Sequence, residues 1–355
     1  MQYLVNDFGD GCCIEIGFYN SLIDFGSQQS GTMPKKGGFF RCNDWDKLII
    51  SHYHTDHYNL LYKINDGSIE INKLIYPHIP TIVGIDDIKE NELIKLVLFF
   101  NMVSVFSDSG VPSYGLINLL DRKTRHNFSK CRVKRGEQID IYNESYHVIW
   151  PPGFIDPASG TSKPLISGIK KIHNIIAEDS LIKELWEEFE NKCSNINTEH
   201  EDIDEGEYAP RIFLKNEDKE RIKPTKDKLS KAIRGITNRL SICLYKDDTF
   251  LFLGDLESEE IKICIDYLKK EFFINHTNFF IAPHHGTHWN DRLLDIYAEN
   301  LIVNNGKKMI VHFEEKFKNI SGSRFHTYSY GDIFFDDEDR TVYPKKMWRY
   351  FRPFF

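Results

Sequence analysis

The chain has 355 residues, of which 41% are hydrophobic and 14% aromatic, so it can bury a sizeable core. A formal net charge of −8 argues against a protein that coats nucleic acid regardless of sequence, although it is compatible with a local basic groove. The longest uninterrupted apolar run near the middle, Leu96 to Phe100, is far too short to span a membrane. We therefore predict one elaborated domain over residues 1–355, without a membrane segment.

Cysteine usage and the N-terminal residues bear on the cellular compartment. The seven cysteines are an odd number and include no CxxC pair, so we expect all of them to be reduced. No basic flank precedes a long apolar stretch at the N-terminus, so no secretory signal is visible. Both observations favour a cytoplasmic protein.

Short strands are predicted in the first 50 residues. Residues 1–5 and 12–25 read as strands separated by the turn at 9–11, and the second stretch forms an antiparallel pair that closes at Asp24. A further short strand is predicted at residues 47–50, and polar residues follow it directly.

The polar stretch after residue 50 is the most informative one in the chain. Three imidazoles and one carboxylate lie within six residues, and they are His52, His54, Asp56 and His57. In extended backbone His52 and His54 point the same way. Asp56 and His57 lie beyond the turn and can face a second point. Imidazole and carboxylate suit zinc, manganese or iron, and their clustering suits two ions that share one hydrolytic site.

The middle of the chain is predicted to contain both strands and helices. Residues 73–76 and 146–150 read as strands, and a helix is expected to begin near Asn59. From residue 86 to 106 the apolar residues recur at helical spacing, which predicts an amphipathic or largely buried helix.

Residues 155–232 are predicted to be an insertion within the domain. Residues 163–193 have helical periodicity, and 226–234 read as a basic helix. Six of the nine residues in 199–207 are acidic, which predicts an exposed loop.

A second group of polar residues follows two later strands. Residues 238–245 and 249–255 are expected to form a hairpin that ends in Gly254-Asp255, and a carboxylate there can bridge two ions. The next strand, 278–282, is followed by His284 and His285. One of these should complete the second metal site, and the other can donate to a phosphate or leaving group. We favour His285 as the ligand because it adjoins Gly286.

Taken in order, these motifs resemble the metallo-β-lactamase fold hydrolases. The motifs are His52-x-His54-x-Asp56-His57 after a strand, Asn-x-x-Ser at 238–241, Gly254-Asp255, and Pro283-His284-His285-Gly286-Thr287. The later ones are closest to the nuclease domain of bacterial DNA-uptake channel proteins, and the match covers roughly residues 1–60, 146–152 and 238–330. This chain lacks the many membrane helices of such a channel protein.

The resemblance implies a fold and a set of roles. The fold is an αββα sandwich, an α/β architecture with two mixed sheets face to face, helices outside and metals at one edge. His52 and His54 would hold one of two divalent ions, zinc or manganese. Asp56 and His57, with His284 or His285, would hold the other. Asp255 would bridge them, Asp24 would orient the metal loop, and His326 in a late loop would approach the site.

The sequence departs from that family at one ligand position. Many relatives place a third histidine where this chain has Trp150, followed by two prolines. His147 lies on the opposite strand face and is a poor substitute. Either the first metal site is weaker, or Asn238 or water completes it.

The expected activity is hydrolysis by a metal-bound hydroxide, with Asp56, Asp255, His284 and His326 as catalytic candidates. Cleavage of nucleic-acid phosphodiesters, as by a nuclease, is our first hypothesis. The alternatives are a small-molecule hydrolase (acting on a cyclic nucleotide, phosphoester or lactone) and a non-catalytic metal-binding assembly module. The tail from Tyr343 to Phe355 interleaves basic and aromatic residues, which suits single-stranded nucleic acid, a homo-oligomer contact or a protein partner, and most simply packing on its own domain.

Overall fold

The computed structural model describes residues 1–17, 20–27, 44–85, 88–104, 116–156, 158, 162–192 and 216–345. The chain forms two compact units, each built from separate stretches of sequence. The first comprises residues 1–78, 123–151 and 240–355, and the second comprises 79–122 and 152–239. Among the described residues, no helix combines the length and apolar character needed to cross a membrane.

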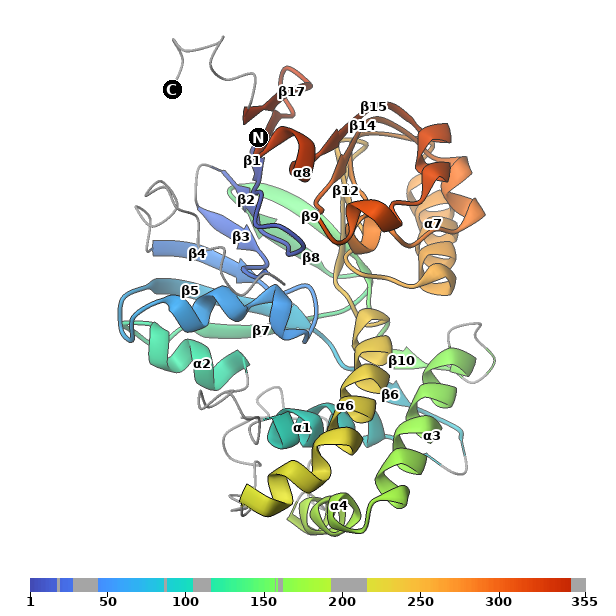
Figure 1. Ribbon diagram of the computed structural model, residues 1–355. Coiled ribbons are helices and arrows are strands. Elements are labelled where there is room, and N and C mark those ends of the chain that lie inside the picture. Colours follow the sequence, from blue (N-terminus) through green and yellow to red (C-terminus); the bar gives the residue numbers. More distant parts are fainter. Residues whose placement is uncertain are drawn as a thin grey trace. The chain divides into compact units, whose positions relative to one another are not determined.

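The first unit contains two mixed β-sheets (Figure 1). The eight-stranded sheet has the order β17-β16-β1-β2-β3-β4-β5-β7. Its strands are β1 (Gln2–Val5), β2 (Ile14–Ile16), β3 (Ser21–Ile23), β4 (Asp44–Ile49), β5 (Glu70–Pro77), β7 (Ser129–Val133), β16 (Ile333–Asp336) and β17 (Thr341–Pro344). Strands β3, β4, β5 and β7 are mutually parallel.

The seven-stranded sheet has the order β15-β14-β13-β12-β11-β9-β8. Its strands are β8 (Gln138–Ile141), β9 (Glu144–Trp150), β11 (Cys243–Lys246), β12 (Phe250–Phe252), β13 (His276–Ile281), β14 (Tyr297–Val303) and β15 (Ser321–His326). Strands β12 to β15 are parallel. Short helices connect the strands: η2 (Thr55–His57), η3 (Asn59–Lys63), η4 (Pro283–Gly286), η5 (Asp291–Asp295), η6 (Ile310–His312), η7 (Glu315–Asn319) and α8 (Thr327–Tyr330).

The two sheets share one buried hydrophobic core. Alternate residues of both sheets enter a single cluster, as the period of two in a strand requires. Tyr3 of β1 stacks on Phe250 of β12, with ring centroids 4.9 Å apart, and on Phe335 of β16 at 4.5 Å. Such aromatic pairs contribute about 0.5–1.5 kcal/mol each beyond burial of their area.

The helix α7 (Ser258–Phe272) packs on the other face of the seven-stranded sheet (Figure 1). Its apolar side chains recur at positions i, i+3, i+4 and i+7, namely Ile261, Cys264, Ile265 and Leu268, and all four are buried. This spacing gives the helix one apolar stripe, which it buries against the sheet.

The parallel strands determine where the polar residues gather. In a parallel arrangement the carboxyl ends of neighbouring strands meet at one edge of the sheet. Asp24 and Ser51 follow β3 and β4 in one sheet, while Asp255 and His284 follow β12 and β13 in the other. Because both sheets enclose the same core, these four strand ends can converge on one site.

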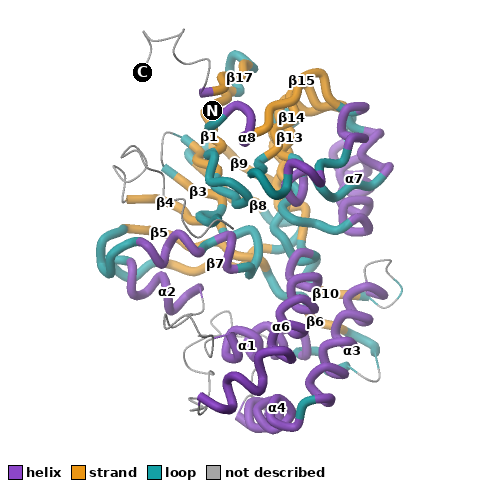
Figure 2. The backbone as a smooth tube through the Cα atoms, in the orientation of Figure 1, coloured by secondary structure: helices purple, strands orange, loops and turns teal. Residues whose placement is uncertain are grey.

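The second unit is mainly helical, as the purple segments in Figure 2 show. It contains α1 (Glu92–Ser104), α3 (Ser162–Glu178), α4 (Ser180–Lys192) and α6 (Asn216–Asn238), with the short parallel pair β6 (Thr81–Ile82) and β10 (Phe154–Ile155). The helix α2 (Leu116–Lys123) also belongs to the second unit, except for its last residue, Lys123, which belongs to the first.

The mixed α/β class predicted from the sequence is confirmed. The hairpin expected over 238–245 and 249–255 is confirmed as β11 and β12, which pair antiparallel, but its first strand begins only at Cys243 because helix α6 continues to Asn238. The helix expected from Asn59 is only the five-residue 3-10 helix η3. The helices expected in 155–232 are present, but residues 152–239 form their unit together with 79–122, a pairing the sequence did not indicate. The acidic stretch at 199–207 and the tail beyond residue 345 lie outside the described residues.

A buried carboxyl group in the first unit should make stability depend on pH. Glu15 in β2 is 3% exposed and accepts a hydrogen bond from Asn6 Nδ2 at 2.8 Å. Burial raises its pKa to about 8, although the Asn6 bond opposes that shift. The folded protein therefore binds this proton more tightly than the unfolded chain, and this contribution to stability is lost as pH rises towards 8.

We expect the free energy of unfolding of Glu15→Gln to decrease less above pH ~5 than that of the wild type. At pH 8 the variant should be the more stable protein, by roughly 4 kcal/mol at most. Denaturant unfolding at several pH values measures this. Glu259→Gln, at an exposed position of α7, is the matched control and should leave the fall in place. Equal pH dependence in the wild type and Glu15→Gln would contradict the prediction.

Candidate metal centre

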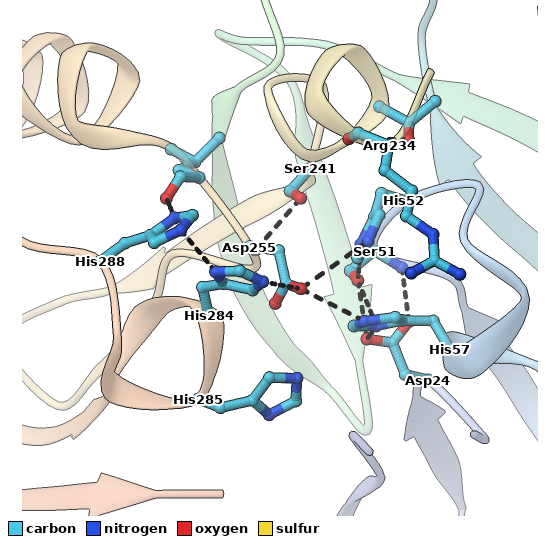
Figure 3. Close-up of polar contacts among 12 residues, drawn as sticks. Asp24, Ser51, His52, His57, Arg234, Ser241, Asp255, His284, His285 and His288 are labelled. Atoms are coloured by element: carbon cyan, nitrogen blue, oxygen red, sulfur yellow. Dashed lines mark hydrogen bonds and ion pairs between the residues drawn. The ribbon is translucent and has the colours of Figure 1, made fainter. Parts of the chain in front are cut away.

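Three buried side chains converge at the carboxyl edge of the two sheets. Side-chain nitrogen and oxygen atoms of His52, His57 and Asp255 all lie within 4.8 Å of one another. Among the described residues, this is the one group of three or more histidine, cysteine or acidic side chains close enough to hold a metal ion. The Nε2 atoms of His52 and His57 lie 3.9 and 3.5 Å from Asp255 Oδ2. His284 Nε2 lies 3.6 Å from the same oxygen, so three imidazoles surround one carboxylate (Figure 3).

Asp24 orients the loop at residues 51–57. Its carboxylate accepts hydrogen bonds from the Ser51 backbone N–H, the Ser51 hydroxyl and His57 Nδ1–H, each at 2.7 Å. Because the Ser51 hydroxyl proton goes to Asp24, Ser51 Oγ accepts from His52 Nδ1–H at 3.1 Å. Both histidines therefore carry a proton on Nδ1, which leaves Nε2 as the atom that can bind a metal.

The Nε2 atoms of His52 and His57 are both buried and have no hydrogen-bond partner. A buried polar atom without a partner is costly, and a lone pair that faces a carboxylate needs a proton or a cation between them. A divalent ion that prefers nitrogen and carboxylate ligands fits this donor set.

Burial and charge move the pKa values of these groups in different directions. Burial lowers the pKa of His52 well below its usual value, and burial likewise lowers that of His284 to about 4. Burial alone would lower the pKa of His57, but the charges of Asp24 and Asp255 outweigh it and raise that pKa well above the usual value. Burial alone would raise the pKa of Asp255, yet His284 and His57 hold it well below its usual range.

Metal uptake should therefore release about one proton at pH 7. In the metal-free protein His57 is protonated, and a metal ion on Nε2 must displace that proton, whereas His52 and His284 are already neutral. We expect metal affinity to rise with pH by about tenfold per unit below the pKa of His57. Titration calorimetry in buffers of different ionisation enthalpy measures the released protons. Asp24→Asn should reduce their number, and proton-neutral uptake by the wild type would contradict the prediction.

The next histidines along the chain are held in a strained turn. His284 and His285 both have left-handed backbones, with φ of 46° and 59°. Non-glycine residues in this region cost about 1–3 kcal/mol each and are retained where the surroundings impose them. The His284 backbone N–H is fixed to Gly254 O at 3.0 Å, and His285 Nδ1–H donates to Asn304 O at 2.7 Å. His285 Nε2 is thus also left for a ligand role.

Other predicted site residues are not in the central group. The ring of His54 lies 4.5 Å from that of His52, but neither His54 nor Asp56 belongs to the three-residue group. The turn η2 then brings His57 into the group with His52 and Asp255, while the expected joint role of His52 and His54 stays a prediction. His326 contacts Asn305 Nδ2 at 3.2 Å and the ring of Phe313.

Trp150, which stands where the resemblance would place a third histidine, is a core residue. Trp150 is 1% exposed and belongs to the hydrophobic cluster beneath α7. The ring of His147 lies 4.6 Å from that of Phe272, which is part of α7. Asn238 ends α6 in the second unit.

Two supporting serines have roles that the sequence did not specify. Ser51 links Asp24 to His52, and only its place directly before His52 hinted at this. Ser241 Oγ accepts the Asp255 backbone N–H at 3.1 Å. Gly254, with φ of +52°, allows this approach, because a Cβ there would lie 2.6 Å from Ser241 Cβ. The Asn-x-x-Ser spacing carried the signal for Ser241.

No protein-family model matches the sequence, and a search of curated proteins gives no significant match.

Proposed function

We propose that this chain is a metal-dependent hydrolase with the αββα sandwich of the metallo-β-lactamase fold. Two observations support that architecture. The two sheets share one core, and α7 covers the outer face of one of them. The motif order also agrees, because His52 and His57 follow β4, Asp255 follows β12, and His284 and His285 follow β13.

One observation carries the proposed chemistry. His52 and His57 direct unpaired, buried Nε2 atoms at Asp255, while their Nδ1 protons are committed to Ser51 and Asp24. This donor set fits zinc or manganese, and we propose that two such ions bind, the second through His284 or His285. Bound ions would supply an activated water and polarise the substrate's ester group.

The chain's own residues prepare that chemistry before any metal binds. Asp24 and Ser51 hold two imidazoles in one tautomer, so little reorganisation is needed on uptake. Asp255 balances the positive charge that gathers at the site. The backbone N–H of Asp255, fixed by Ser241, keeps the carboxylate in place.

We propose nucleic-acid phosphodiesters as the substrate, in line with the resemblance to uptake nucleases. The net charge of −8 requires local positive charge for such a substrate. Lys307 and Lys308 supply some within the first unit, because both are exposed and follow Asn304, whose carbonyl binds His285. Asp10 fixes this segment by accepting the backbone N–H groups of Gly306 and Lys308 at 2.6 and 3.1 Å.

The deciding assay offers metal-stripped protein single-stranded DNA, duplex DNA, RNA and cyclic nucleotides, with manganese, zinc or magnesium added in turn. We expect cleavage of the polymers, with manganese at least as effective as zinc. Cleavage of cyclic nucleotides alone would favour a small-molecule hydrolase, which the acidic net charge also suits. Bound metal without any cleavage would favour a non-catalytic metal-binding module.

A further inference from the structure

His288 is a conspicuous side chain that the roles above leave unused. It lies four residues after His284, and its Nε2 is 2.6 Å from His284 Nδ1. Its other nitrogen, Nδ1, is 2.9 Å from the carbonyl oxygen of Leu256 and 3.8 Å from Glu257 Oε2. Figure 3 shows His284 between His288 and Asp255.

The positions of the protons follow from what each atom can do. A backbone carbonyl only accepts hydrogen bonds, so the proton on His288 lies on Nδ1, where Glu257 also favours it. Nε2 of neutral His288 then accepts, and His284 Nδ1 must donate. His284 is accordingly left with a lone pair on Nε2, the atom 3.6 Å from Asp255 Oδ2.

Thr287 gives independent support for the same proton positions. Its hydroxyl donates to the His284 carbonyl at 2.7 Å, so its proton is already used. The same oxygen lies 3.1 Å from His284 Nδ1 and can therefore only accept from it. His288 Nε2 and Thr287 Oγ are thus both acceptors that face His284 Nδ1. Without a proton on Nδ1, three lone pairs would face one another.

These contacts form a closed ring. Asp255 is followed directly by Leu256, the Leu256 carbonyl binds His288, His288 binds His284, and His284 Nε2 returns to Asp255. The chain segment that provides the carboxylate therefore also fixes the imidazole that faces it. The strained backbone of His284, with φ of 46°, is held in the same place.

We propose that His288 is a positioning residue that fixes the tautomer and ring orientation of His284, so that Nε2 is preformed as a metal ligand. The metal-binding consequence rests on the proposed function, whereas the tautomer does not. Hydrogen-bond partners of this kind typically change metal affinity by roughly 10–100-fold when they are removed. His284 is thereby favoured as the ligand from the adjacent pair.

The primary test is long-range ¹H–¹⁵N NMR of the metal-free wild-type protein. We expect His284 to carry its proton on Nδ1. Finding that proton on Nε2 would overturn the proposal, whatever the protein binds or cleaves. Failure of the wild type to bind any metal would instead count against the proposed function and leave the tautomer result standing.

Two variants extend the test to metal retention. His288→Phe keeps a ring but removes the 2.6 Å acceptor of His284 Nδ1–H and leaves only Thr287 Oγ at 3.1 Å, so we expect a larger share of His284 with its proton on Nε2 and a fall in zinc or manganese affinity of roughly 10–100-fold. His288→Gln offers an amide oxygen near the place of Nε2 and should retain the tautomer and most of the affinity. Unchanged tautomer and affinity in His288→Phe would overturn the proposal.

The matched control is His276→Phe. His276 lies at the opposite end of β13, with Nε2 3.6 Å from Glu299 Oε1. This variant should leave both the NMR signals of His284 and the metal affinity unchanged, because its partners are remote from the carboxyl edge. If His288→Phe does not fold, the wild-type tautomer and the behaviour of His288→Gln still decide the matter.

Discussion

Replacing Asp255 by asparagine should abolish metal-dependent hydrolysis, lowering kcat/KM by roughly 10³-fold or more. The change keeps the size of the side chain but removes the negative charge that three histidine Nε2 atoms face at 3.5 to 3.9 Å. An amide nitrogen in this place would also donate to one of those atoms and occupy the position that a metal needs. The fold should persist, because Ser241 binds the backbone of residue 255 and not its side chain.

The measurement combines activity, metal content and thermal unfolding of the same preparations. Asp248→Asn is a suitable control, because Asp248 precedes the same strand β12 at its other end and has a left-handed backbone, with φ of 55°, that asparagine tolerates. We expect this control to retain metal and activity. Undiminished hydrolysis by Asp255→Asn in a metal-defined assay would remove the basis for the proposed function.

The sequence predicts which segments form the centre, because the relevant residues follow apolar strands. His52, Asp255 and His284 each come directly after such a strand, and parallel strands gather their carboxyl ends at one edge. Each loop by itself indicated only candidate ligands, and the expectation that the two halves share one site came from the family resemblance. The hairpin ending at Asp255 was predictable from two short apolar runs and a polar turn.

The arrangement within the loop was not predictable in the same way. Extended backbone places residues two apart on one face, and the rings of His52 and His54 do lie 4.5 Å apart. That periodicity says nothing of His57, which lies in the turn η2 and whose Nδ1 binds Asp24, 33 residues before His57. A long-range hydrogen bond thus orients His57, and the pattern along one segment contains no information about it.

The packing of the helices in the second unit was also not predictable from local sequence patterns. Helical periodicity predicted α3 and α4 correctly, but it cannot say which distant helix covers an apolar stripe. Phe99 of α1 packs edge-on against Trp186 of α4, with ring centroids 4.9 Å apart. Residues 123–151, which belong to the first unit, separate these two helices in the sequence. Their contact therefore cannot be predicted from either segment alone.

Gly26→Ala should strongly disturb the loop at residues 51–57. A Cβ at Gly26 would lie 1.8 Å from the Asp56 carbonyl oxygen and 2.6 Å from the His57 carbonyl carbon. Both are backbone atoms, so no side-chain rotation relieves the overlap. The segments cannot separate freely, because the Phe25 backbone N–H donates to His57 O at 2.7 Å.

We expect Gly26→Ala to lower the free energy of unfolding by roughly 3 kcal/mol or more, and to weaken metal binding because His57 must shift away from Asp24. Gly235→Ala in α6 is the matched control, since a Cβ there meets no atom within 4 Å outside its own helix. That change should stabilise its helix by about 0.5–1 kcal/mol through propensity alone. Denaturant unfolding and metal titration of both variants separate the two cases. Wild-type stability and affinity in Gly26→Ala would mean that the loop does not approach Gly26 as closely as described, and the orientation of His57 by Asp24 would then need another explanation.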